Sequence, residues 1–89
     1  MQTALASFYS YGPGASVACG HPAYMGVANR TLRCGTRVRF CVTRCAIGIV
    51  DDRGPFVYGR LFDLTVQLAK AIGFPLGAGV WRVRWRIGR

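Results

Sequence analysis

The chain is poor in the side chains that most enzymes use for chemistry. Its 89 residues include no glutamate, one histidine, His21, and one lysine, Lys70. Covalent serine catalysis needs a base beside the nucleophile, and His21 is the only imidazole. The segment Gly12–Gly14 lacks the lysine and the helix that follow a phosphate-binding loop. We therefore expect neither a serine hydrolase nor a P-loop nucleotide enzyme.

Long apolar segments are also missing. No run approaches the 18 apolar residues of a membrane-spanning helix, so we expect no stable membrane insertion. No signal peptide is evident at Met1–Leu5, because the pattern of a folded domain begins almost at once. Two explanations are open: a mature or excised domain of an exported protein, or delivery by another route, such as a phage particle or release on lysis.

Negative charge is scarce. Three aspartates face twelve basic residues, and the net charge is +9. This balance suits a polyanionic partner such as nucleic acid, anionic lipid or an acidic cell wall, and it also suits a solvated surface. Tryptophan and arginine alternate over Val80–Ile87. The apolar face of this segment is explained more simply as part of the hydrophobic core than as a nucleic-acid-binding surface, so we expect no nucleic-acid partner.

Four cysteines are present, Cys19, Cys34, Cys41 and Cys45. In a short chain they indicate disulfides and an oxidising compartment. Of the three possible pairings, a Cys41–Cys45 bridge across a hairpin turn leaves Cys19–Cys34 to close a long loop. Two alternatives stay open: four buried free thiols, and a zinc site that includes His21 but lacks paired C-x2-C knuckles. We expect no metal and no cofactor.

Glycine and proline interrupt the chain throughout, which favours short strands over a helical bundle. The predicted strands span residues 4–11, 36–42, 46–50, 59–64 and 80–87, and residues 15–31 are predicted as a long loop. Residues 65–72 are predicted as a helix, with Thr65 as its N-cap and Gly73 just after its end. The pattern predicts a mainly β, closed barrel with one or two short helices, in one domain over residues 1–89.

All carboxylate side chains lie between Asp51 and Asp63. Singly, Asp52 can shape the turn predicted at 51–55, and Asp63 can cap the helix or pair with Arg60. Because all three acids lie in one short segment of a strongly basic chain, the sequence predicts a functional site there. Apolar surroundings, here Phe56, raise the pKa of a carboxyl as a general acid requires. Glycosidic bond cleavage is the commonest chemistry that needs only one or two carboxyls.

Several short blocks of sequence follow one another in a specific order. They are Ala6–Tyr9 with Tyr11–Gly14, Ala18–Gly20, Ala28–Val38, Asp52–Phe56 (DRGPF), Gly59–Arg60 and Asp63–Thr65 (DLT). In this order they resemble the rare lipoprotein A-like double-psi β-barrels over nearly the whole chain. DRGPF followed by DLT is the specific part of the resemblance.

The resemblance implies a six-stranded double-psi β-barrel, as in barwin-like proteins and the first domains of expansins. It implies bacterial peptidoglycan as partner and lytic transglycosylation as activity, in which an acid protonates the glycosidic oxygen and the muramyl 6-hydroxyl closes onto C1. Asp52 matches the acid of the signature motif, and Asp63 matches an aspartate kept in expansin-like relatives. Asp51 matches no motif, and we expect it to be a bystander in the turn. The expected substrate contacts are Tyr9, Tyr11, Asn29, Arg53, Phe56, Tyr58 and Arg60.

Two positions depart from the lytic pattern. His21 stands where many lytic members have glutamate, and Asn29 stands where they have histidine. We expect His21 to take over a proton-handling role, since the ordinary pKa of histidine suits it. The departures leave two alternatives: a non-catalytic glycan-binding module, or a phage tail component that docks at the cell wall with other virion proteins. Each implies a location on the extracellular, periplasmic or cell-wall side.

Overall fold

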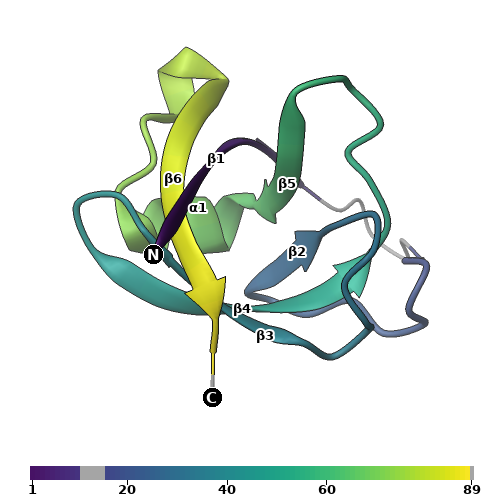
Figure 1. The fold of residues 1–89 in the computed structure, drawn as a ribbon. Helices are drawn as coiled ribbons and strands as arrows, with labels where there is room; N and C mark the ends of the chain where they lie inside the picture. Colours follow the sequence, from purple (N-terminus) through teal and green to yellow (C-terminus); the bar gives the residue numbers. More distant parts are fainter. Residues whose placement is uncertain (11–15, 89) are drawn as a thin grey trace.

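Six strands close into a barrel in the computed structural model, which describes residues 1–10 and 16–88 (Figure 1). The elements are β1 (Gln2–Tyr9), β2 (Gly26–Ala28), β3 (Arg37–Cys41), β4 (Cys45–Asp52), β5 (Arg60–Thr65), α1 (Val66–Ile72), the 3-10 turn η1 (Leu76–Ala78) and β6 (Val80–Ile87). Around the ring the order is β1-β5-β2-β4-β3-β6. The pairs β1–β5 and β2–β4 are parallel, and the other neighbours are antiparallel. The predicted closed β-barrel with short helices is confirmed.

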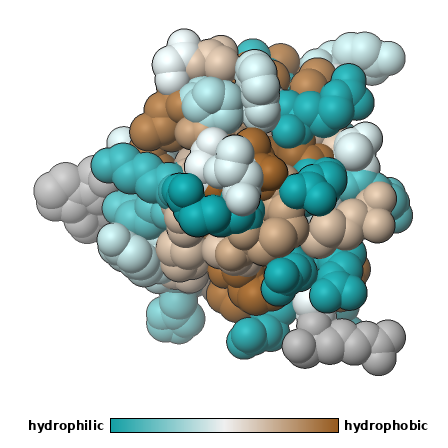
Figure 2. Space-filling view, turned by 90° about the vertical axis from the view of Figure 1, so that its left-hand side faces the viewer, coloured by the Kyte–Doolittle hydropathy of each residue, from teal (hydrophilic) through white to brown (hydrophobic). Residues whose placement is uncertain are grey.

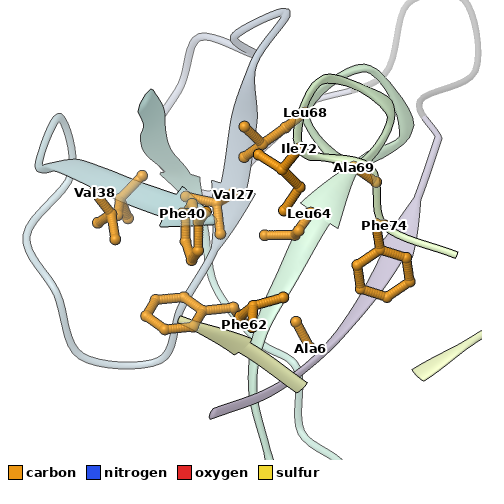
Figure 3. Packing of buried hydrophobic residues seen from close by; sticks show 12 residues of the cluster. Ala6, Val27, Val38, Phe40, Phe62, Leu64, Leu68, Ala69, Ile72 and Phe74 are labelled. Atoms are coloured by element: carbon orange, nitrogen blue, oxygen red, sulfur yellow. The ribbon is translucent and has the colours of Figure 1, made fainter. Parts of the chain in front are cut away.

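Alternating side chains fill the barrel from its strands. Val38 and Phe40 of β3 and Phe62 of β5 are fully buried, whereas Arg37, Arg39 and Asp63 beside them are less buried. The Phe62 ring contacts Phe40 and Trp85 edge to face, at centroid distances of 4.9 and 5.0 Å. Figure 3 shows Phe40 and Phe62 beside aliphatic side chains from β2 and α1. This packing sets the inward and outward faces of every strand near the carboxylates.

The predicted helix is confirmed together with both of its ends. The Thr65 hydroxyl accepts a hydrogen bond from the Leu68 amide at 3.3 Å, and Gly73 ends the helix with a φ of 77°. Leu68 and Ile72 of α1 are buried against the barrel (Figure 3). In the described part of the chain, no helix is long and apolar enough to cross a membrane.

The structure corrects three predicted segments. A short strand, β2, lies in the segment predicted as a loop, and it has only three residues, too few to show a period. β1 begins at Gln2 and ends at Tyr9, so Ser10 lies outside the strand, and the last predicted residue, 11, lies outside the described part. β4 continues to Asp52, so Asp51 and Asp52 belong to a strand rather than to a turn.

All four cysteines form disulfides, with the predicted pairing. Cys19 bonds to Cys34 and Cys41 to Cys45, with Cα–Cα distances of 5.7 and 4.1 Å. The alternatives of free thiols and of a zinc site with thiolate ligands are therefore wrong. The second bridge spans the β3–β4 hairpin turn, and Figure 2 views that side of the molecule, where hydrophilic side chains separate small hydrophobic areas.

Candidate functional site

The barrel brings Asp52 and Asp63 to the same level on two strands. Ala28 of β2 pairs with Asp52 of β4 on one side and with Asp63 of β5 on the other. Because neighbouring strands lie about 4.8 Å apart, the two Cα atoms are separated by roughly 10 Å. Asp63 points outward, since Phe62 and Leu64 on either side of it are buried in the core. Two carboxylates thus flank one short strand on the outside of the barrel.

A β-bulge turns Asp52 towards this outer face. Val27 pairs with Val50 but Ala28 pairs with Asp52, so Asp51 is an extra residue in β4. Asp51 is 2% exposed, and its Oδ2 accepts a hydrogen bond from the Ala23 amide at 2.7 Å. Bulges of this kind re-aim side chains next to active sites. The expectation that Asp51 is a bystander in a turn is wrong, because it is a buried carboxylate that holds the loop before β2.

Asp52 is held by backbone amides. Its Oδ1 accepts hydrogen bonds from the amides of Ala18 and Arg53, both at 2.9 Å. The Ala18 bond ties the segment before the Cys19–Cys34 bridge to the end of β4, and the Cys19 amide bonds to the Asp51 carbonyl at 3.1 Å. The carboxylate therefore has a fixed orientation.

Asp63 lies in a less polar setting. The Ser7 hydroxyl, on the neighbouring strand β1, donates a hydrogen bond to its Oδ1 at 3.0 Å. Burial raises the pKa of Asp63 above its ordinary value, and the negative charge of Asp52 raises it further. The Ser7 hydrogen bond and the positive charge of Arg60 lower that pKa, but burial has the larger effect. A carboxyl of this kind keeps its proton to a higher pH than an exposed aspartate.

Asn29 and Arg53 have structural contacts. Asn29 is 2% exposed, its Nδ2 donates to the Leu61 carbonyl at 3.1 Å, and its Oδ1 accepts from the Thr31 and Leu32 amides. The Arg53 guanidinium donates to the carbonyls of Asn29 and Leu32 at 3.0 and 2.6 Å. The two side chains hold the segment after β2 beside the carboxylates. Substrate contact by either residue stays a prediction, and for Asn29 its burial argues against it.

Exposed aromatic side chains lie on the loops around the carboxylates. Phe56 and Tyr58 are 78% and 101% exposed, in the loop that joins β4 to β5. Sequence reasoning missed Tyr24, which is 76% exposed and whose carbonyl accepts a bond from the Thr65 hydroxyl at the end of β5. An aromatic residue in a segment rich in glycine and proline was the available signal. Tyr9 is half-buried and pairs with Thr65.

The structure gives less direct information on where the remaining predicted site residues lie relative to Asp52 and Asp63. His21 is exposed and follows Ala18 and Cys19, which bond to β4, so it lies in the loop attached to Asp52. Its role in proton handling stays a prediction. Arg60 is half-buried at the start of β5, and Tyr11 lies outside the described residues. Among residues 1–10 and 16–88, no cluster of three or more metal-binding side chains and no enclosed pocket is present.

Solved structures share the fold. An apo expansin of Clavibacter michiganensis superposes with a TM-score of 0.79 at 24% identity, over 98% of this chain and 50% of that one. A point mutant of the Clavibacter michiganensis expansin, in complex with cellohexaose, gives 0.78 at 23% identity, over 99% of this chain and 51% of that one. A Streptomyces papain inhibitor gives 0.74 at 25% identity, over 99% and 94% of the two chains. The predicted double-psi barrel is confirmed.

Curated proteins are similar in sequence. A protein of Nostoc sp. PCC 7120, named probable endolytic peptidoglycan transglycosylase RlpA, is 42% identical over 90% of this chain and 24% of its own length. A protein of the same name from Synechocystis sp. PCC 6803 is 47% identical over 52% of this chain and 15% of its own. The chain thus spans a quarter or less of these relatives. The family model for lytic transglycolase matches residues 1–85, and the chain therefore belongs to the lytic transglycolase family of double-psi β-barrel domains.

Proposed function

We propose that this domain cleaves the glycan strands of bacterial peptidoglycan by lytic transglycosylation, with Asp63 as the general acid. The observation that carries the proposal is the pair of outward carboxylates, Asp52 and Asp63, on either side of β2. The names of the Nostoc and Synechocystis relatives support the same chemistry.

The surroundings of the two aspartates suggest different roles for them. Asp52 accepts two backbone amide bonds on one oxygen and is oriented as a negative, hydrogen-bond-accepting group. Asp63 has a raised pKa because it is half-buried, which suits a proton donor. We therefore exchange the roles expected from the sequence motif: Asp63 donates the proton, and Asp52 stabilises the positive charge that develops at the anomeric carbon.

The reaction balances without water. The Asp63 carboxyl gives its proton to the glycosidic oxygen as the C1–O bond breaks, and the leaving sugar departs with a free hydroxyl. The muramyl 6-hydroxyl oxygen then bonds to C1, and its proton returns to Asp63. The product is a 1,6-anhydro sugar, and the enzyme regains its starting protonation state.

The exposed aromatic side chains of Tyr24, Phe56 and Tyr58 supply the glycan contact in this proposal. The apolar faces of sugar rings stack on aromatic rings, and these three are exposed aromatic residues on the described loops next to β5. They hold the glycan strand while Asp52 and Asp63 act on one glycosidic bond.

Soluble products from purified sacculi, analysed by mass, test the proposal. Wild-type protein is expected to release anhydro-muropeptides, and Asp63→Asn is expected to lower the release by about 100-fold or more, the usual contribution of a general acid. Asp52→Asn is expected to reduce it as well. Lys70→Gln, on the exposed side of α1, is the control and is expected to behave as wild type. Wild-type rates in Asp63→Asn would exclude that residue as the acid.

A second candidate is a glycan-binding module that does not cut. The exposed Tyr24, Phe56 and Tyr58 favour it, and so does the absence of a glutamate at the position of His21. The same experiment separates the two: wild-type protein that sediments with sacculi without releasing products supports the binding module. In that case Tyr24→Ala and Tyr58→Ala are expected to weaken sedimentation.

We place the domain on the cell-wall side, because two disulfides in so small a domain fit an oxidising compartment. Export as part of a longer protein and delivery in a phage particle both agree with this location. Mass spectrometry of purified virions and of cell-envelope fractions from the source organism distinguishes the two routes.

A further inference from the structure

The outward face of two neighbouring strands consists largely of arginine. Arg82, Arg84 and Arg86 project from β6 and are exposed, and Arg37 and Arg39 project from β3 beside it. We call these five residues the arginine face. Successive arginines on β6 are about 7 Å apart, because alternate residues of a strand share one side. The face is therefore a regular row of positive charge.

Nothing on these strands neutralises that charge. β1, β3 and β6 contain no aspartate or glutamate. Arg39 and Arg86 are direct cross-strand partners, an arrangement of like charges that disfavours the folded barrel. A bound polyanion removes this repulsion, so binding an anionic partner is more favourable at this face than at arginines that lie apart from one another.

The arginine face is remote from the carboxylates. In the ring order β1-β5-β2-β4-β3-β6, strand β6 stands opposite β2, the strand between Asp52 and Asp63. Figure 1 shows β6 and β2 on different sides of the barrel. A polymer segment on the arginine face therefore leaves the carboxylates free for another segment.

We propose that the arginine face is a second docking surface, which binds the stem-peptide carboxylates of peptidoglycan while the opposite side of the barrel engages a glycan strand. This inference rests on the proposed function. Guanidinium groups pair with carboxylates through two parallel hydrogen bonds, and peptidoglycan repeats such carboxylates along each strand.

The make-up of the face favours this partner over nucleic acid and membrane. On the side of β3 and β6 that carries the arginines, the other side chains of these two strands are Val80 and Cys41, whose sulfur is in a disulfide. The neighbouring strands add Leu5, which pairs with Arg82, and Ile47 and Ile49, which pair with Arg39 and Arg37, so arginine interrupts the apolar side chains on this face. Single-stranded nucleic acid is held by aromatic stacking platforms, and membrane interfaces take a broad apolar face. The two disulfides also fit the oxidising side of the membrane, where peptidoglycan lies.

Matched charge variants test the proposal. Arg82→Gln/Arg86→Gln removes two charges from the face, and Arg33→Gln/Lys70→Gln removes two exposed charges elsewhere, so each lowers the net charge from +9 to +7. Arg84 is left in place because its Nη2 donates to the Val42 carbonyl at 3.1 Å. Sedimentation with sacculi is measured at low salt and at about 0.15 M salt, where screening weakens exposed charge pairs. Thermal unfolding confirms that both variants are folded.

The face variant is expected to bind sacculi about five- to tenfold more weakly at low salt, because each exposed ion contact contributes about a factor of two to five. The control variant is expected to bind as wild type does. Sacculi with amidated carboxylates are expected to lose the difference between wild type and face variant. Equal losses in both variants, or an unchanged difference on amidated sacculi, would overturn the proposal.

Two further probes decide the class of partner. Stronger wild-type binding to single-stranded DNA or to anionic phospholipid vesicles than to sacculi, at about 0.15 M salt, contradicts the proposal. Anhydro-muropeptide release is measured separately on the same samples. A protein that binds through the arginine face but releases no product disproves cleavage alone, whereas a protein that releases product but sediments equally well with and without the arginine face disproves only the docking surface.

Discussion

At the scale of single residues, the proton on Asp63 depends on opposing influences. Burial and the charge of Asp52 raise its pKa, and the Ser7 hydrogen bond and Arg60 lower it. A general acid acts in its protonated form, so activity is present below this pKa and is lost as the pH rises through it. The position of the alkaline limb of the pH profile therefore reports on the surroundings of Asp63.

Ser7→Ala is expected to move that limb to higher pH. The substitution removes the 3.0 Å hydrogen bond, one of the influences that lower the pKa of Asp63. The measurement is the rate of product release from sacculi as a function of pH, with the exposed Ser10→Ala as the matched control. A limb that stays in place, or moves to lower pH, would argue against Asp63 as the acid.

At the scale of elements, β2 and the bulge in β4 place the two aspartates. Gly26 of β2 lies against Asp51, and a Cβ at Gly26 would overlap Asp51 Oδ2 and come within 2.8 Å of the Ala23 carbonyl oxygen. With Asp51 buried at this place, the space beside residue 26 of β2 fits only a glycine. A larger residue at position 26 would therefore affect Asp52 and Asp63 indirectly, by disturbing the strand and the bulge that position them.

Gly26→Ala is expected to lower the free energy of unfolding by about 1–3 kcal/mol, as overpacking of a filled interior does. Urea unfolding followed by tryptophan fluorescence measures the loss. Gly77→Ala is the control, because a Cβ there meets no atom within 4 Å. Equal free energies of unfolding for the two variants would show that Asp51 moves away from a Cβ at position 26 without any loss of stability.

At the scale of the whole molecule, the two disulfides secure different parts of the barrel. Cys19–Cys34 joins residues 15 positions apart and adjoins Ala18 with its bond to Asp52, whereas Cys41–Cys45 spans only the β3–β4 turn. Loss of a bridge frees the unfolded chain more when the loop is longer. The bridges therefore differ in their link to the site as well as in their effect on stability.

Replacing both cysteines of a pair by serine separates these effects. The Cys19/Cys34 variant is expected to lose about 3 kcal/mol of unfolding free energy, and the Cys41/Cys45 variant about 2 kcal/mol. The first is also expected to lose activity on sacculi below its unfolding temperature, because the amide that orients Asp52 is released. Activity lost equally in both variants would show that the Cys19–Cys34 bridge has no special connection to the site.

The sequence by itself determined the strands that alternate, the capped helix and the segment that carries the acids. These features are local, since a period, a cap or a short loop is set by residues near one another in the chain. Only the tertiary structure decided that Asp51 is buried and that Asp52 and Asp63 flank β2. A three-residue strand has no period, and a bulge exists only relative to its partner strand, so neither can be read from sequence. Barrel closure likewise set the arginines of β6 opposite the carboxylates, because the order of strands around the ring differs from their order in the chain.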